Sequence, residues 1–313
     1  MKYVMFSVGT AEARPGLIDG DQVIDLRVAI DDHLRRTGAE NPIRTRIVRE
    51  ITGDLADLLQ LGTWGATLLE QSVHTESLDN PARFSLDEVR LHAPLQPRRL
   101  RDCSVFEGHA RDARARRGEE VPDVWFEMPI YYKGNPGTVV GPEAVVRWPE
   151  YSTYMDYELE IGIVIARGGR DIPVEKALDH ILGLTIINDF SARDIQRREM
   201  AGGLGPAKGK DFATGLGPWI CTLDELPPLD SLEMTATVNG ELWSTGSTSD
   251  MHFGFAEIVA HASAGEPLVA GEVIGTGTCN GGSGYENDRR LMSGAVVELA
   301  VTGLGTLRNI VEQ

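Results

Sequence analysis

Two carboxylates alternate along an apolar stretch near the middle of the chain. Glu158 and Glu160 lie within YELEIGIVI, whose alternation and β-branched residues predict a strand over 157–165. Side chains two positions apart share a face of a strand, so the two carboxylates should lie at most about 7 Å apart. The apolar residues between them predict a half-buried strand. Like charges this close repel unless a cation lies between them, and hard divalent cations prefer oxygen ligands.

A third carboxylate follows the next apolar run. ILGLTIIN predicts a buried strand over 181–188, and Asp189 comes where the apolar residues end. Taken separately, Glu158 and Glu160 could line a solvated face and Asp189 could be a turn residue. Because they occur together with a Gly- and Lys-rich loop, we favour a metal site built from these three carboxylates.

An imidazole and a carboxylate lie three residues apart in an arginine-rich segment. His109 and Asp112 should share a face of a helix. A carboxylate that holds an imidazole fixes its tautomer and raises its basicity, as a general base requires. The alternative is an ion pair on the surface of that helix.

Two further segments carry candidate binding groups. Arg193 and Gln196 share a face near the start of the helix expected after the third carboxylate, where an arginine can bind a substrate carboxylate bidentately. A salt bridge from Arg193 to Glu199 or Asp194 fits the spacing equally well. The Gly-Lys loop is not a Walker A motif, because Asp follows Lys210; it more plausibly brings an ammonium group to an anionic centre.

Composition limits the classes of protein. The chain has 313 residues, of which 42% are hydrophobic and 25% charged, as is ordinary for a globular protein in water. The formal net charge of −17 argues against nucleic acid as a partner. No apolar run reaches eighteen residues, so no membrane span is expected. Three widely spaced cysteines favour a reducing, cytoplasmic location, and Cys279 is more plausibly packed than nucleophilic.

The pattern of elements predicts two domains. Residues 1–96 form a small α+β unit, with strands at 3–8, 12–17 and 22–26 and helices at 28–36 and 43–71. Residues 86–95 predict a strand that leads out of it. Residues 97–313 form a larger, predominantly β unit, whose last third alternates short strands with one helix at 255–264.

Four motifs together resemble the fumarylacetoacetate hydrolase family over roughly residues 98–311. They are DYELEIGIVI, NDFSARDIQ, GKDF-x-T with GPW, and VIGTGTCNGGSG. The resemblance implies an α+β, predominantly β fold in which the larger unit is a mixed β-roll with a distorted barrel-like core. It also implies a homodimer and the small N-terminal domain of bacterial members.

The resemblance implies a role for each motif residue. The metal ligands are Glu158, Glu160, Asp189 and Asp102; the catalytic residues are His109, Asp112 and Lys210; and the substrate-binding residues are Arg193, Gln196, Tyr132, Thr214 and Thr276. Asp112 stands where bacterial acylpyruvases carry a glutamate.

The implied activity is metal-dependent hydrolysis of a C–C bond in a 1,3-diketo acid, a small keto-acid or dicarboxylic substrate. The expected metal is Mg²⁺, with Mn²⁺ and Ca²⁺ as alternatives. His109 would activate water, and Lys210 would stabilise the oxyanion. Decarboxylation, isomerisation or dehydration of a 2-keto acid at the same site is the alternative, and a non-catalytic ligand-binding β-protein is a third.

Overall fold

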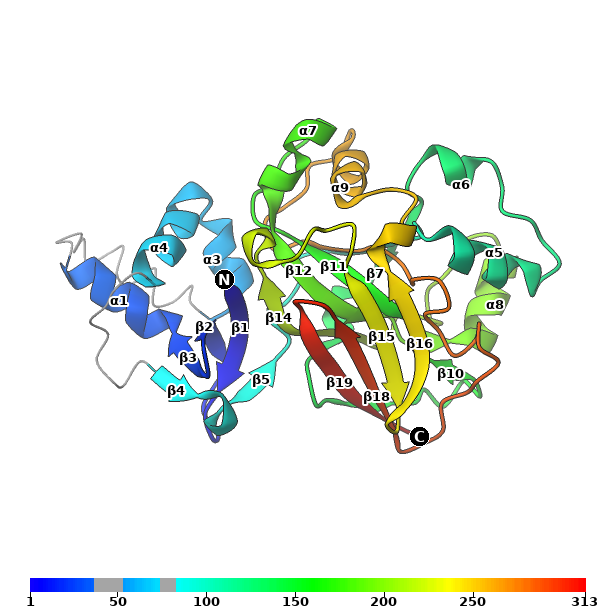
Figure 1. The fold of residues 1–313 in the computed structure, drawn as a ribbon, viewed down its shortest axis with the longest axis horizontal. Coiled ribbons are helices and arrows are strands. Elements are labelled where there is room, and N and C mark those ends of the chain that lie inside the picture. The colour runs from blue at the N-terminus through cyan, green and yellow to red at the C-terminus, as the bar shows by residue number, and fades with distance from the viewer. Residues whose placement is uncertain (37–52, 74–82) are drawn as a thin grey trace.

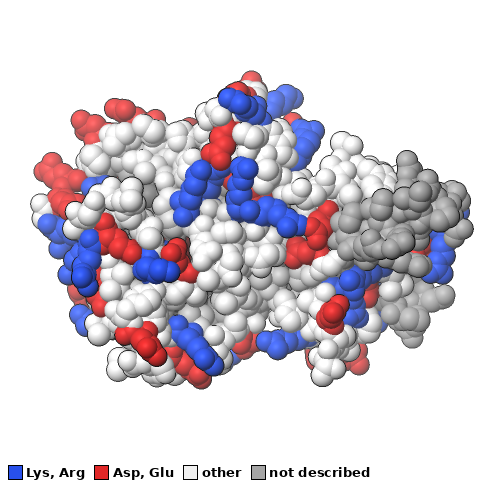
Figure 2. Space-filling model, turned by 180° about the vertical axis from the view of Figure 1, so that it is seen from behind, with Lys and Arg blue, Asp and Glu red and all other residues white. Residues whose placement is uncertain are grey.

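The computed structural model describes residues 1–36, 53–73 and 83–313. A large twisted sheet runs through the molecule, a second sheet packs beside it, and the helices lie around the periphery (Figure 1). Within the described residues, no helix is long and apolar enough to cross a bilayer. On the face drawn in Figure 2, Lys and Arg side chains are interspersed with Asp and Glu.

The large sheet has twelve strands: ten follow the order β4-β3-β2-β1-β14-β12-β11-β17-β6-β7, and two more lie off this path, β5 paired to β1 and β8 to β14. Its strands are β1 (Lys2–Ser7), β2 (Arg14–Asp19), β3 (Gln22–Asp25), β4 (Arg83–Ser85), β5 (Arg90–His92), β6 (Leu100–Cys103), β7 (Tyr131–Gly134), β8 (Val139–Val140), β11 (Leu159–Ile165), β12 (Ile181–Asn188), β14 (Thr214–Cys221) and β17 (Val273–Gly275).

The second sheet has the order β16-β15-β18-β19-β9, and a separate pair joins β10 to β13. These strands are β9 (Val145–Arg147), β10 (Met155–Asp156), β13 (Ser191–Ala192), β15 (Glu233–Val238), β16 (Glu241–Ser247), β18 (Ala295–Val301) and β19 (Gly305–Glu312). The described helices are α1 (Leu26–Arg36), α3 (Leu55–Gln60), α4 (Thr63–Val73), α5 (Glu107–Ala115), α6 (Val124–Glu127), α7 (Val174–Ala177), α8 (Arg193–Ala201) and α9 (Phe255–Ser263).

The predominantly β architecture predicted from the sequence is confirmed, with open sheets in place of a closed barrel. Strand β11, predicted to be half buried, is buried along its whole length. It lies between β12 and β17, and its two faces contribute to different hydrophobic cores: Ile161 and Ile163 to one, Val164 to the other. The half-buried expectation was therefore wrong, because interior strands of a covered sheet bury both faces.

The N-terminal region joins the large sheet directly. Strand β1 pairs antiparallel with β14, so that Lys2 lies opposite Cys221 and Tyr3 opposite Ile220. Side chains from both sides of residue 97 share one buried core, among them Met5 and Ile187. The domain boundary near residue 97 stays a prediction, but the hydrogen bonding of the sheet is continuous across it.

Local predictions in the N-terminal region were met in part. The helix expected over 43–71 falls partly outside the described residues; the described part is two helices, α3 and α4, separated at 61–62. The strand expected over 86–95 is short, because a 3₁₀ turn precedes β5.

In the second sheet, a two-residue hairpin turn at Asn239-Gly240 joins β15 to β16. Both residues have positive φ, as a type I′ turn requires.

Candidate metal centre and active site

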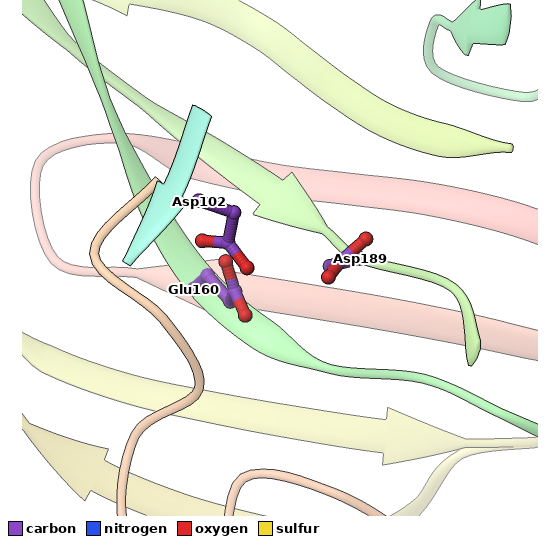
Figure 3. A group of neighbouring side chains, drawn as sticks. All are labelled: Asp102, Glu160 and Asp189. Atoms are coloured by element: carbon purple, nitrogen blue, oxygen red, sulfur yellow. The ribbon is translucent and has the colours of Figure 1, made fainter. Parts of the chain in front are cut away.

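Three carboxylates converge because of the order and register of the large sheet. Asp102 on β6 pairs with Gly275 on β17, which in turn pairs with Gly162 on β11. Glu160 lies two residues before Gly162, and Asp189 directly follows β12, the other neighbour of β11. Figure 3 shows Asp102 and Glu160 side by side, with Asp189 beyond the end of the neighbouring strand.

The geometry of the three carboxylates suits a divalent cation. One oxygen from each of Asp102, Glu160 and Asp189 lies within 4.8 Å of the others, and all three side chains are buried. Glu160 Oε2 and Asp189 Oδ1 have no hydrogen-bond partner although they are buried. Buried acceptors without a donor are costly, and oxygen ligands are those that Mg²⁺, Mn²⁺ and Ca²⁺ prefer. The residues present therefore fit a metal ion.

The electrostatics of the three carboxylates also favour a bound cation. Burial, followed by the charges of neighbouring carboxylates, holds the pKa values of Asp102 and Glu160 well above their usual ranges. Burial also raises the pKa of Asp189, although Lys210 partly opposes this shift. A cation among these groups would remove the repulsion that raises the pKa values.

A glycine makes room for the cluster. A Cβ atom at Gly275 would lie 2.2 Å from Asp102 Oδ1 and 3.1 Å from Glu160 Oε2. The two carboxylates thus occupy the space that a side chain at position 275 would fill, so only glycine fits there. Other bonds fix their orientation: the Gly277 amide donates to Asp102 Oδ1, and the Thr278 hydroxyl donates to Glu160 Oε1.

Glu158 differs from these three carboxylates. Its Oε1 lies 2.7 Å from Arg193 Nη1, and its Oε2 accepts a hydrogen bond from Lys210. Burial alone would raise its pKa, but the two cations and His109 outweigh burial and hold the pKa well below its usual range. Lys210 also donates to Asp189, and these anions raise the pKa of Lys210 despite burial, so its amine stays protonated.

Arg193 is buried and fully engaged within the protein. Its Nε donates to Asp156 at 2.8 Å, and its Nη2 lies 2.7 Å from the same carboxylate. Its Nη1 donates to Gln196 Oε1 and also contacts Glu158. Asp156 in turn accepts hydrogen bonds from the amides of Gly284 and Tyr285. Arg193 and Asp156 together therefore connect β10 and Glu158, the residue before β11, with the loop that follows β17.

His109 lies next to the carboxylates and is paired with an acid from a distant loop. Its Nδ1 is 2.9 Å from Glu286 Oε2, and its Nε2 is 3.9 Å from Glu158 Oε1. Burial lowers the pKa of His109, but Glu286 and Glu158 outweigh that effect and the net shift is upward. The pKa of Glu286 is lowered despite burial, chiefly by His109, so it remains a carboxylate.

The loop after β17 holds both partners in place. The hydroxyl of Ser283 and the amide of Gly281 donate to Glu286, at 2.7 and 3.0 Å. Asn280 Oδ1 accepts a hydrogen bond from the His109 amide at 3.2 Å. A Cβ atom at Gly108 would lie 2.5 Å from the Asn280 side chain, so helix α5 approaches this loop closely. The contact fixes the imidazole against the carboxylate.

A cavity of about 270 Å³ opens onto these groups. It is lined by the candidate metal ligands Asp102 and Glu160 and by His109 and Lys210. A smaller cavity of about 100 Å³ adjoins it and shares His109 as a lining residue. The arrangement combines a cation site, a positioned base and an ammonium group around one space, which is what reactions at a carbonyl require.

Comparison with known proteins decides the family. The family model described as fumarylacetoacetate (FAA) hydrolase C-terminal matches residues 101–312. The chain belongs to the fumarylacetoacetate hydrolase family. Oxaloacetate tautomerase YisK of Bacillus subtilis is 35% identical over 230 residues, which cover 72% of this chain and 74% of that protein.

Solved structures extend the likeness to the whole chain. A fumarylacetoacetate hydrolase from Exiguobacterium antarcticum has a TM-score of 0.74 at 27% identity, covering 100% of this chain and 99% of that one. A 5-carboxymethyl-2-hydroxymuconate delta-isomerase from Mycobacterium smegmatis has a TM-score of 0.70 at 25% identity, with the same coverage. The fumarylacetoacetate hydrolase family thus includes hydrolases, isomerases and a tautomerase, and its enzymes typically use a divalent metal.

Within this family assignment, one predicted pairing is corrected. Asp112 is exposed on α5, and the carboxylate that contacts His109 is Glu286. In the helix, position 112 points to solvent while position 109 faces the loop after β17. Glu286 was missed because it lies far from His109 in the sequence; its one signal is that an acid follows the glycine-rich CNGGSG segment.

The other family-derived residues fall into two groups. Tyr132 and Gln196 line the cavity, and the Tyr132 hydroxyl donates to Asp189 at 2.7 Å. Thr214 and Thr276 are buried, and neither is among the residues that line the two cavities described here. The Thr276 hydroxyl donates to the Gly277 carbonyl and accepts a hydrogen bond from the Ile161 amide, so its contacts are with the backbone of its own loop and of β11.

Proposed function

We propose that the protein is a metal-dependent hydrolase that cleaves a C–C bond in a small 1,3-diketo acid. The observation that carries this proposal is the imidazole of His109, which lies between Glu286 and Glu158 at the edge of the carboxylate cluster. Such a base beside a cation site is suited to deprotonating water next to a substrate carbonyl.

The contact between His109 and Glu286 defines which imidazole nitrogen acts as the base. With Glu286 ionised at Nδ1, the proton of a neutral imidazole resides on Nδ1, and Nε2 carries the free lone pair. Nε2 then accepts a proton from water, and Glu286 stabilises the imidazolium. The water oxygen adds to the acyl carbonyl carbon, the bond to the central carbon breaks, and that carbon takes the proton back. One water is consumed, and a carboxylic acid and a 2-keto acid are formed.

Lys210 and the carboxylates have separate roles in this scheme. Lys210 is a protonated donor within the cavity, so it can bind the oxygen on which negative charge develops. Asp102, Glu160 and Asp189 would hold the divalent ion, and we propose Mg²⁺. When bound, the ion supplies Lewis acidity that polarises a substrate carbonyl. Glu158 orients Lys210 and Arg193 beside that site.

The second candidate is keto–enol tautomerisation of a 2-keto acid. The 35% identity to the oxaloacetate tautomerase of Bacillus subtilis favours it. The reaction also needs a base at His109, but a C–H proton of the substrate is moved and no water is consumed. Isomerisation or decarboxylation at the same site would likewise leave products without an added water.

The test is turnover of acetylpyruvate, longer acylpyruvates and oxaloacetate, with and without Mg²⁺. Loss of enol absorbance measures the rate, and mass spectrometry identifies the products. Metal-dependent formation of pyruvate and a second acid from an acylpyruvate supports the hydrolase. Enol–keto interconversion without cleavage contradicts the hydrolase and supports the second candidate, whereas enzyme-dependent release of CO₂ contradicts both and indicates a decarboxylase.

The variant His109→Ala sharpens the same test. We expect turnover to fall by roughly 10²- to 10⁴-fold, the usual contribution of a general base. Binding of Mg²⁺, measured by calorimetry, should persist because the carboxylate cluster is intact. Asp112→Asn is the matched control: it changes an exposed group on the same helix and should keep wild-type turnover. Wild-type turnover in His109→Ala would contradict the assignment of the base.

A further inference from the structure

The cavity has a polar side and a side on which apolar residues are mixed with His109, Arg114, Arg117 and Gln196. Its polar groups come mainly from strands β6, β7 and β11 and from the Lys210 loop. The apolar wall, as we name it, comes from helices α5, α6 and α8 and from the segments next to them. It consists of Ala110, Ala113, Trp125, Ile130, Met200 and Pro206. In Figure 1 these three helices lie together at the end of the molecule opposite the N-terminal region.

Three arginines near the apolar wall contact carboxylates of the protein. Arg114 and Arg117 also line the cavity, but both contact Glu119, at 3.5 and 3.1 Å. Arg193, the arginine expected to bind a distal substrate carboxylate, is held by Asp156 and Glu158. A substrate carboxylate at one of these arginines would lie close to the carboxylate that already contacts it, and that repulsion weakens the attraction. The electrostatics therefore give little advantage to a second carboxylate on the substrate.

Two of the apolar side chains at this wall are open to solvent, whereas Trp125 is buried. Met200 is 45% exposed and Ile130 is 37% exposed, although both are large and apolar. Trp125 is held rigidly: its Nε1 donates to Ser104 Oγ at 3.1 Å, and its ring packs against His252. Apolar surface in a cavity gains free energy when a ligand covers it, and a fixed aromatic ring binds without a large loss of conformational freedom.

We propose that the substrate is a small 2-keto acid that carries an uncharged hydrocarbon substituent. The keto-acid group lies at the carboxylate cluster, and the hydrocarbon lies against Trp125, Ile130 and Met200. A cavity of about 270 Å³ is close to the lower limit of small-molecule sites, about 300 Å³, so the substituent is short. The inference rests on the proposed function, because that function places the keto acid in this cavity.

The test is binding of a homologous series of 2-keto acids, measured by isothermal titration calorimetry with Mg²⁺ present. The series is pyruvate, 2-oxobutanoate, 2-oxopentanoate and 2-oxohexanoate; 2-oxoglutarate is the matched diacid, with a carboxylate in place of the terminal methyl of 2-oxopentanoate. We expect Kd to fall about fourfold per methylene and 2-oxopentanoate to bind more tightly than 2-oxoglutarate. Tighter binding of 2-oxoglutarate, or a Kd independent of chain length, would overturn the proposal.

Variants locate the hydrocarbon. Met200→Glu places a charge in the apolar wall, and the ratio of the pyruvate Kd to the 2-oxohexanoate Kd should fall toward one. Ile130→Asp should change that ratio in the same direction. Leu204→Glu is the control, since Leu204 is 96% exposed and is not among the lining residues. A ratio that responds to Leu204→Glu as strongly as to Met200→Glu would overturn the assignment.

Binding and turnover separate the two proposals. If the series binds as expected but no acylpyruvate is cleaved, the proposed hydrolase activity is contradicted and the proposed hydrocarbon substituent is supported. If acylpyruvates are cleaved but 2-oxoglutarate binds more tightly than 2-oxopentanoate, the hydrolase activity is supported and the proposed hydrocarbon substituent is contradicted. Failure of every 2-keto acid to bind in the presence of Mg²⁺ would overturn the inference about the substrate.

Discussion

The carboxylate cluster and the His109–Glu286 pair belong to one site but are built differently. Asp102, Glu160 and Asp189 are carried by or directly follow strands of one sheet, and backbone pairing sets their separation. His109 and Glu286 come from a helix and a loop, and side-chain contacts to that loop hold them together.

The two halves also differ in charge balance. In the cluster, buried like charges raise the pKa values, and two carboxylate oxygens lack a donor. In the pair, His109 Nδ1 lies 2.9 Å from Glu286 Oε2, and each group shifts the pKa of the other toward its charged form. The cluster should therefore govern metal binding and metal-dependent stability, and the pair should govern the pH dependence of turnover. Four variants test this division.

The largest effect is expected from Glu160→Gln. Turnover should fall by roughly 10³-fold, because the Lewis acid contributes several kcal/mol. The folded-state pKa of Glu160 is raised, so its charge destabilises the metal-free fold at neutral pH and its removal should raise Tm there. The gain in Tm on adding Mg²⁺ should be lost. Glu233→Gln, on an exposed glutamate of β15, is the control. A wild-type Mg²⁺ affinity in Glu160→Gln would contradict the metal site.

The next largest effect is expected from Glu286→Gln. Turnover should fall by roughly 10²-fold, because the imidazole loses the group that orients it. Glu286 raises the pKa of His109, and the base acts only when neutral. Removing that charge lowers the pKa, so the acid limb of the kcat/KM profile should move to lower pH. An unmoved acid limb, with Mg²⁺ affinity unchanged, would break the assignment of the pair.

Gly275→Ala should damage the cluster alone. The added Cβ would lie 2.2 Å from Asp102 Oδ1, and overpacking of this kind costs about 1–3 kcal/mol. We expect Mg²⁺ affinity, measured by calorimetry, to fall roughly tenfold, while the acid limb of the pH profile stays in place. A shifted acid limb with unchanged Mg²⁺ affinity would show that the two halves are not separable in this way.

The smallest effect is expected from Gly108→Ala, the counterpart of Gly275→Ala on the other half. Its Cβ would meet the Asn280 side chain at 2.5 Å, and that half-buried side chain can shift more easily than the buried Asp102 carboxylate can. Turnover should fall about threefold with Mg²⁺ affinity unchanged. Loss of Mg²⁺ affinity in this variant would contradict the independence of the cluster.

Much of the fold and half of the site followed from local patterns. Alternation predicted β11 and placed Glu158 and Glu160 on one face, while the apolar run predicted β12 and placed Asp189 at its end. The same reasoning failed for the burial of β11, because alternation does not report what covers each face of a sheet. Family resemblance supplied Asp102 as a ligand, the Gly-Lys loop indicated Lys210, and the structure brings both to the cavity.

The sequence by itself determined the chemical inventory: carboxylates at strand spacing, an imidazole on a short helix and a lysine in a glycine-rich loop. The tertiary structure alone decided how they are paired. It gave His109 to Glu286 and not to Asp112, and it engaged Arg193 with Asp156 and Glu158. The physical reason is that periodicity fixes which residues share a face of one element. Contacts between elements depend on strand order, register and loop path, which no local spacing encodes.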